Sequence, residues 1–247
     1  MKKLFLSLLL TSALFANELT IKSDDGFILH GWLNKPTTTK QSSPIILFAH
    51  QFGSDHTIWN DLAKKFNAKG YATLSIDLRG HGKSILQNDK ENKVVIASSF
   101  EHIKEALIQS DKKISFENIP LDLTAWLEHI SEDESLDIEN LYLFGSSLGA
   151  GTMIPILNEY EAKGLVAISA GKLEKLSEDI DMALAGSMTK TIFIASKNDP
   201  LNANKITMEY TIKSILGTSL IISGEGHGTV ILPKVEHFIF SFMNNIK

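Results

Sequence analysis

Short apolar runs typical of buried strands alternate with segments of helical periodicity along most of this chain. Ile45–Ala49 is a continuous apolar run, which suits a strand covered on both faces, and Ala72–Ile76 follows as a second buried strand. Between them, Trp59, Leu62 and Phe66 recur at helical spacing. Later strands are expected at Leu141–Phe144, Leu165–Ser169, Thr191–Ala195 and Leu220–Ser223. Strands that alternate with helices in this way predict an α/β fold with a mainly parallel sheet.

The remaining elements complete this pattern. Leu19–Lys22 and Phe27–Leu33 flank the turn signal Asp24-Asp25-Gly26, so we expect an antiparallel hairpin at an edge of the sheet. Further helices are expected at Leu123–Ile130, Met153–Leu157, Ile206–Ile215 and Val235–Met243. The prediction is a sheet of about eight strands with helices on both faces. A chain of 247 residues accommodates one large domain, which we place at residues 17–247.

The first 16 residues have a different character from the rest. Lys2-Lys3 precedes the mostly apolar stretch Leu4–Phe15, and polar sequence follows Ala16, which is typical of a secretory signal peptide cleaved near Ala16. The apolar stretch has about 12 residues, against the roughly 20 that span a bilayer, so cleavage is favoured over an uncleaved membrane anchor. We therefore expect a bacterial protein of the periplasm or the extracellular space, without a membrane span after cleavage. An intracellular enzyme with a misinterpreted N-terminus is the alternative.

Composition and spacing exclude several classes of site. The chain has no cysteine, which excludes disulfides, thiolate zinc sites and a cysteine nucleophile, and its net charge of −5 comes without the basic cluster that nucleic-acid binding needs. His50, His56 and His81 match no metal-ligand spacing, so no metal site is expected. Gly82-Lys83-Ser84 resembles the end of a phosphate-binding loop, but Asp77 stands where that loop needs glycine.

A candidate nucleophile stands between an expected strand and an expected helix. Gly145-Ser146-Ser147-Leu148-Gly149 has the pattern G-x-S-x-G, in which the central serine occupies a strained turn with its hydroxyl exposed. The flanking positions need glycine because strand and helix approach each other closely there. This pattern makes Ser147 the candidate nucleophile.

The residues that would activate this serine follow later strands. Asp199 comes just after Thr191–Ala195, and His227 just after the last strand, so the order is serine, acid, histidine. Serine needs a base to remove its proton, and the base needs an acid that orients it. Ligand sites in such sheets lie at the carboxyl ends of the strands, where all three residues are expected. Rival acids are Asp179, Asp181 and Glu174.

Two further motifs carry a resemblance to a known superfamily. His50-Gln51-Phe52-Gly53 is similar to the His-Gly-x oxyanion loop of α/β-hydrolases, and residues 77–84 resemble their D-x-R-G-x-G-x-S segment. With Ser147, Asp199 and His227 these motifs cover nearly the whole chain in the order of that superfamily, nearest its small dienelactone-hydrolase-like and esterase-like members.

The resemblance implies further site residues. It implies that the backbone N–H groups of Phe52 and Leu148 form the oxyanion hole. Gln51 replaces the usual glycine, so its side chain is expected to crowd the loop or reach the substrate. His50 and Gln51 are candidates for lining the substrate site, with bracing of the site loops as the other role expected of His50 and of His81. Many relatives carry a cap domain after the strand Leu165–Ser169, but only about twenty residues stand there, so no large cap is expected.

The expected reaction is hydrolysis of carboxylic esters of small acyl groups through an acyl-Ser147 intermediate. Its substrate is a small molecule, and it needs no metal or organic cofactor. A peptidase or thioesterase would use the same three residues and remains an alternative. A non-catalytic binding protein on this scaffold would lack one of these residues or an elbow glycine, and none is missing.

Residues 85–115 interrupt the alternation of strands and helices. They contain a helical face at Ile103, Leu107 and Ile108 together with many charges. The segment is either a surface excursion or a wall over the site. Because it leaves from the carboxyl end of Ala72–Ile76, we expect some of its apolar residues to pack beside the site and to enclose only small acyl groups.

Overall fold

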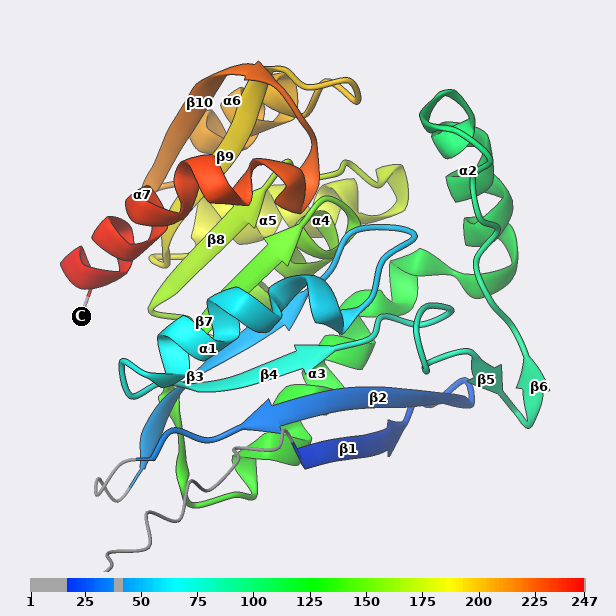
Figure 1. Ribbon diagram of the computed structural model, residues 1–247, viewed down its shortest axis with the longest axis horizontal. Helices are drawn as coiled ribbons and strands as arrows, with labels where there is room; N and C mark the ends of the chain where they lie inside the picture. The colour runs from blue at the N-terminus through cyan, green and yellow to red at the C-terminus, as the bar shows by residue number, and fades with distance from the viewer. Residues whose placement is uncertain (1–16, 38–41, 247) are drawn as a thin grey trace, which may run out of the picture.

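The computed structural model describes residues 17–37 and 42–246 (Figure 1). In these residues ten strands form one sheet in the order β10-β9-β8-β7-β3-β4-β2-β5-β6, with β1 paired to β2. The strands are β1 Asn17–Lys22, β2 Phe27–Asn34, β3 Ser43–Ala49, β4 Ala72–Ile76, β5 Leu86–Gln87, β6 Lys90–Glu91, β7 Leu136–Ser146, β8 Gly164–Ile168, β9 Lys190–Asn198 and β10 Gly217–Glu225. The helices are α1 Asn60–Asn67, α2 Ile103–Ile114, α3 Ile119–Ser131, α4 Leu148–Met153, α5 Ser177–Gly186, α6 Ala203–Lys213 and α7 Leu232–Asn245. The signal peptide predicted in residues 1–16 lies outside the described residues.

Neighbouring strands are parallel from β10 through β9, β8, β7 and β3 to β4. The pairs β4–β2, β2–β5 and β5–β6 are antiparallel. β1 and β2 form the predicted hairpin, with Lys22 opposite Ile28 across the turn. The predicted α/β fold with a mostly parallel sheet is therefore confirmed. The strand count exceeds the expected eight because residues 85–115 contribute β5 and β6, each two residues long.

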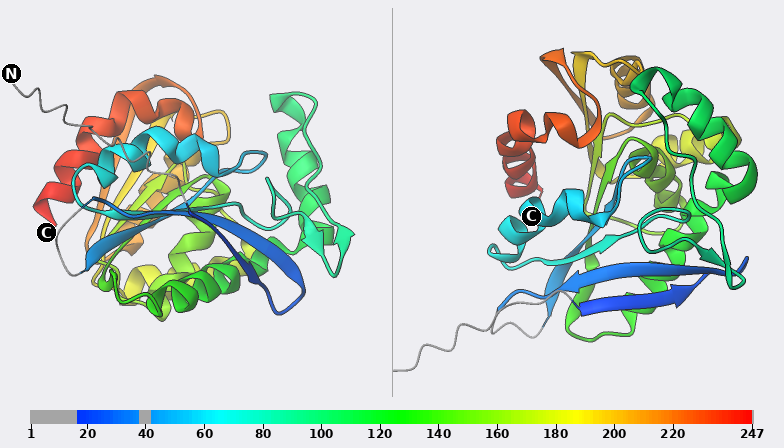
Figure 2. Two further views of the ribbon diagram at one scale, coloured as in Figure 1. Left: turned by 60° about the horizontal axis from the view of Figure 1, so that its bottom comes forward. Right: turned by 45° about the vertical axis from the view of Figure 1, so that its right-hand side comes forward.

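Helices cover both faces of the sheet, as the sequence predicts (Figure 2). In β3, Ile46 and Phe48 face the core under α1 and α7, whereas Ile45 and Leu47 face the opposite core. That second core contains the buried faces of α3, α4, α5 and α6. A strand that alternates between two cores must be apolar throughout, which explains its continuous apolar run.

The segment between β8 and β9 forms only a short 3₁₀ turn at Glu174–Leu176 and α5. The expectation of no large cap domain is therefore confirmed. α2 stands apart from the layers, on the side toward which the arrows of β4, β7 and β8 point (Figure 1). Within residues 17–37 and 42–246, no helix combines the length and the apolar character that crossing a membrane requires.

Candidate active site

Ser147 occupies a sharp turn between β7 and α4. Its φ of 49° and ψ of −110° form a conformation that L-residues rarely adopt, and such strain is typical of nucleophile elbows. The elbow is closely packed, because a Cβ on Gly145 would lie 2.4 Å from Cα of Ala150 and one on Gly149 would lie 2.5 Å from the carbonyl oxygen of Ala49. Both glycines are therefore required by the close approach that the sequence motif predicts.

The structure brings Ser147, His227 and Asp199 into one hydrogen-bonded chain. Nε2 of His227 lies 2.7 Å from Oγ of Ser147, and Nδ1 lies 2.9 Å from each carboxylate oxygen of Asp199. Because an ionised carboxylate only accepts hydrogen bonds, Nδ1 carries the proton and Nε2 is free to accept the serine proton. This is the arrangement in which an imidazole removes a proton from a hydroxyl.

Asp199 is held as an anion inside the protein. Its side chain is fully buried, and burial alone would raise the pKa of the carboxyl. The hydrogen bond and charge of His227, followed by N–H donors of Leu201 and Ala203, outweigh burial and lower the pKa of Asp199. The two backbone donors lie in the turn after β9 and at the first residue of α6, so the local fold stabilises the charge.

The rival acids lie elsewhere. Asp181 is half exposed in α5 and forms an ion pair with Lys213 at 2.6 Å. Asp179 lies in the same helix, and Glu174 lies in the 3₁₀ turn before it. Among the described residues, Asp199 is the carboxylate that contacts His227.

The two predicted oxyanion donors lie on neighbouring segments. Leu148 is the first residue of α4, so its N–H group has no acceptor within the helix. Phe52 lies in the loop after β3, and Gly149 N–H donates to the carbonyl oxygen of His50 at 3.1 Å, which ties that loop to the elbow. Within the described part of the chain, neither the N–H of Phe52 nor that of Leu148 has a hydrogen-bond acceptor. Such free donors are what an oxyanion hole needs.

His50 lies behind the site and is not part of the lining, so of its two expected roles the lining role is corrected. It is fully buried, its Nδ1–H donates to the carbonyl oxygen of Gln51 at 2.8 Å, and its Nε2 accepts from Leu78 N–H at 3.0 Å. Burial lowers the pKa of His50, which agrees with a neutral ring. His50 therefore braces the loop that carries Phe52. Gln51, in contrast, does line the site.

A cavity of about 510 Å³ opens in front of Ser147. Its lining is mostly apolar and comes from the loops after β3 and β9, the elbow, the end of β10 with the segment after it, and α2 with the 3₁₀ turn before it. The lining residues are Gln51, Phe52, Phe100, Ile103, Lys104, Leu107, Ser147, Pro200, Leu201, Glu225, Gly226, His227 and Val230. The segment 85–115 thus contributes Phe100, Ile103 and Leu107, as expected for a wall. Lys104 of the same helix also borders the cavity. Leu201 and Val230 were missed, although their positions two and three residues after Asp199 and His227 could have indicated them.

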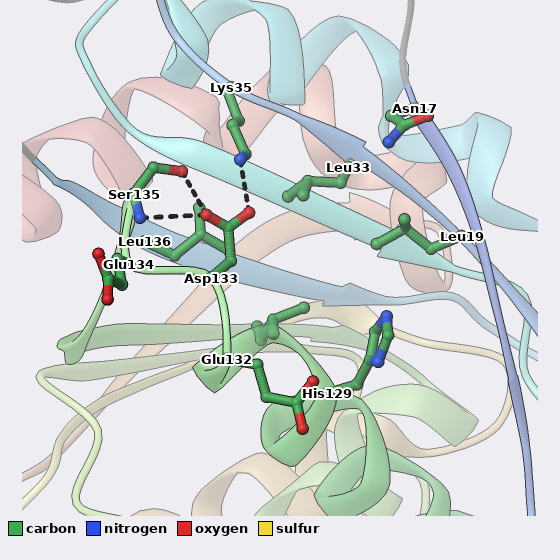
Figure 3. Close-up of a pocket in the computed structure, with 11 residues that line it drawn as sticks. Asn17, Leu19, Leu33, Lys35, His129, Glu132, Asp133, Glu134, Ser135 and Leu136 are labelled. Atoms are coloured by element: carbon green, nitrogen blue, oxygen red, sulfur yellow. Dashed lines mark hydrogen bonds and ion pairs between the residues drawn. The ribbon is translucent and has the colours of Figure 1, made fainter.

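A larger hollow of about 830 Å³ lies far from Ser147, where β7 begins and α3 ends (Figure 3). Leu19, Leu33 and Leu136 line it together with charged side chains. Its main polar contact is internal, since Lys35 and Asp133 form an ion pair at 2.5 Å. Size alone therefore does not identify the site, and the hydrogen-bonded chain at Ser147 does.

One group of side chains in the described residues has the spacing of metal ligands: Asp55, His56 and Asp77. Both oxygens of Asp77 and one oxygen of Asp55 accept hydrogen bonds from protein donors. Asp55 accepts from Thr57 N–H at 2.8 Å, and Asp77 accepts from Nδ1 and the N–H of His56, both at 2.8 Å. The two bonds from His56 to Asp77 hold the loop after β3 against the loop after β4.

Comparisons with known proteins identify the family and agree with the fold. The model of a hydrolase family described as serine aminopeptidase, S33, matches residues 40–194, a range that includes Ser147 and ends before Asp199. Among solved structures, the α/β-hydrolase GrgF from Penicillium sp. sh18 is similar at a TM-score of 0.71 and 14% identity, over 94% of this chain and 97% of that one. Est1E from Butyrivibrio proteoclasticus, solved with ferulic acid, has a TM-score of 0.67 at 13% identity, over 92% of this chain and 99% of that one. An acetyl xylan esterase from Paenibacillus sp. R4 has a TM-score of 0.69 at 15% identity, over 92% of this chain and 83% of that one. No curated protein matches the sequence significantly.

Proposed function

The chain belongs to the serine aminopeptidase S33 family of α/β-hydrolases, and from this premise we propose that it hydrolyses carboxylic esters of small acyl groups with Ser147 as nucleophile. The observation that carries the proposal is the hydrogen-bonded chain from Ser147 through His227 to Asp199 at the floor of an apolar cavity. The acetyl xylan esterase among the similar structures favours an ester as the substrate.

The proposed reaction has two halves. Oγ of Ser147 attacks the ester carbonyl carbon while its proton passes to Nε2 of His227. The resulting imidazolium, stabilised by Asp199, returns the proton to the departing alkoxide, so an alcohol leaves and an acyl-serine remains. Water then attacks the acyl-serine, giving its proton to Nε2, and the proton returns to Oγ as the acid is released. Each half passes through an oxyanion.

The N–H groups of Phe52 and Leu148 would donate to this oxyanion. Charge on the carbonyl oxygen develops only in the transition state, so donors already in place stabilise that state more than the substrate. Every proton in this scheme moves between side chains of the protein, substrate and water.

Cleavage of an amide is the second candidate function, because the family is described as an aminopeptidase. The same three side chains would serve, and a thioester would react likewise. Comparing p-nitrophenyl esters with amino-acid p-nitroanilides separates the first two possibilities. We expect the esters to be hydrolysed and the p-nitroanilides to remain intact, and clear hydrolysis of a p-nitroanilide would assign the protein as a peptidase.

The test of the nucleophile is Ser147→Ala. A fluorophosphonate probe should label the wild type and leave this variant unlabelled, and ester hydrolysis should fall to the background rate. Ser146→Ala serves as the neighbouring control, since it leaves Oγ of Ser147 in place and should still be labelled, although more slowly. Equal labelling of Ser147→Ala and the wild type would refute the assignment.

We also propose that the protein is exported to the periplasm or beyond. The support is the composition of residues 1–16. Cell fractionation and N-terminal sequencing of the purified protein test this, and an intact Met1 on a cytoplasmic protein would refute it.

A further inference from the structure

The side-chain oxygen of Gln51 accepts hydrogen bonds from the last residue of β7 and from the 3₁₀ turn after β10. Oε1 lies 2.8 Å from Oγ of Ser146, 2.9 Å from the N–H nitrogen of Thr229 and 3.2 Å from Oγ1 of Thr229. Because a backbone N–H can only donate, the contact with Thr229 fixes which end of the amide faces inward. The amide oxygen is therefore shared by three donors.

These contacts join the segments that carry the proposed chemistry. Gln51 immediately precedes Phe52, Ser146 immediately precedes Ser147, and Thr229 follows His227 by two residues. One amide thus connects the loop of an oxyanion donor, the nucleophile elbow and the loop of the base.

The side chain of Gln51 is closely packed against neighbouring residues. A Cβ on Gly228 would lie 2.3 Å from Oε1 of Gln51 and 2.9 Å from Oγ of Ser146, so the close approach requires glycine, and φ of Gly228 is +62°. Ser146 is fully buried. The backbone of Gln51 is held as well, since its carbonyl oxygen accepts from Nδ1–H of His50. Both ends of Gln51 are therefore anchored.

We propose that Gln51 is a positioning residue that holds the oxyanion loop, the elbow and the histidine loop in register. This inference rests on the proposed function of Ser147, His227 and Asp199. Gln51 acts through Phe52, Ser147 and His227 rather than on the substrate. A glycine at position 51 could not make these contacts, so the Gln51 side chain gives the site a fixed geometry.

Gln51→Met tests the proposal, because methionine has a similar length and no strong acceptor. Misplacement of reacting groups by about 1 Å costs on the order of a hundredfold in rate, so we expect kcat to fall about 10- to 100-fold while KM changes less than about threefold. The rate of labelling by a fluorophosphonate should fall by a similar factor. Gln109→Met, on the exposed face of α2, is the matched control and should keep the wild-type kcat.

A double-mutant cycle of Gln51→Met and Ser146→Ala tests whether Gln51 acts through its contact with Ser146. Ser146→Ala removes one of the three donors and should lower kcat about two- to tenfold, which tests the proposal even if Gln51→Met does not fold. If Gln51 acts by holding Ser146, adding Ser146→Ala to Gln51→Met should cost little more. Thermal unfolding of each variant shows whether the fold persists.

Two results would overturn the proposal. One is a folded Gln51→Met with wild-type kcat and labelling rate, and the other is a rise in KM alone, which would assign Gln51 to substrate binding. Both leave the proposed function standing, because they require an active wild type. A wild type that neither hydrolyses esters nor reacts with the probe would instead refute the proposed function.

Discussion

Asp199 is the residue whose environment is most specific to its proposed task. Its buried carboxylate accepts from Nδ1–H of His227 and from two backbone N–H groups, one in the turn after β9 and one at the start of α6. These donors keep the pKa of Asp199 low in spite of burial, so the carboxylate stays charged while the imidazole gains a proton. The charge is available when the imidazolium forms.

Asp199→Asn is therefore expected to lower kcat by about 10⁴-fold, because an amide donor facing Nδ1 selects the wrong imidazole tautomer. The measurement is ester hydrolysis by the folded variant. Asp181→Asn is the matched control, since Asp181 is half exposed and pairs with Lys213, and it should keep wild-type activity. Loss of activity in Asp181→Asn or Glu174→Gln, with Asp199→Asn active, would show that the acid is a different residue.

At the same scale, sequence order predicts the three reactive side chains but not the role of Gln51. Ser147, Asp199 and His227 each follow an apolar run, and such positions lie together once the sheet is parallel. The partners of Gln51 stand 95 and 178 residues away, in Ser146 and Thr229. Nothing in the local sequence indicates which donors an amide will meet across three loops.

Among the elements, α2 has the most direct influence on what the cavity accepts. Ile103 and Leu107 line the cavity from one face of this helix, and Ile108 on another face is 55% exposed. This helix borders the proposed site of the acyl group with apolar surface. Each methylene of the acyl chain buried there contributes about 0.8 kcal/mol, or roughly a fourfold gain in kcat/KM. The gain ends when the chain extends past the apolar surface of the helix.

Replacing Ile103 and Leu107 together by serine should flatten the dependence of kcat/KM on acyl length across C2 to C8 p-nitrophenyl esters. Acetyl ester hydrolysis should persist, since the nucleophile and its partners are untouched. Ile108→Ser on the same helix is the control and should keep the wild-type profile. An unchanged profile in the double variant would mean that α2 does not contact the acyl group.

Elements were predictable to different degrees for physical reasons. β3, β4 and β8 are buried on both faces, so their apolar runs identify them without ambiguity. β5 and β6 are two residues long and show no periodicity. α4 begins directly after Ser147, at Leu148 rather than Met153, because the elbow requires the helix to start at once. Its continuation, Ile154–Asn158, is a 3₁₀ turn.

At the scale of the whole molecule, burial of His81 links stability to pH. His81 is buried against His50 and Phe52, and burial followed by the proximity of His50 lowers the pKa of His81 to about 3. In the unfolded chain a histidine titrates near 6.5. Between these values the unfolded state binds a proton that the folded state does not. The contribution of His81 to stability is therefore complete above pH 6.5 and is lost as pH falls.

At pH 5 this loss amounts to about 2 kcal/mol for His81, taking 1.36 kcal/mol per pH unit below 6.5. Asp122 titrates in the same window with the opposite sign, because burial outweighs its ion pair with Arg79 and raises the pKa of Asp122 to about 6. The informative quantity is thus the difference between variants.

Urea unfolding at pH 7.5, 6 and 5 should show that His81→Gln loses less free energy of unfolding on acidification than the wild type. His102→Gln, an exposed histidine beside α2, should follow the wild type. Parallel losses in His81→Gln and the wild type would mean that His81 is protonated in the folded state.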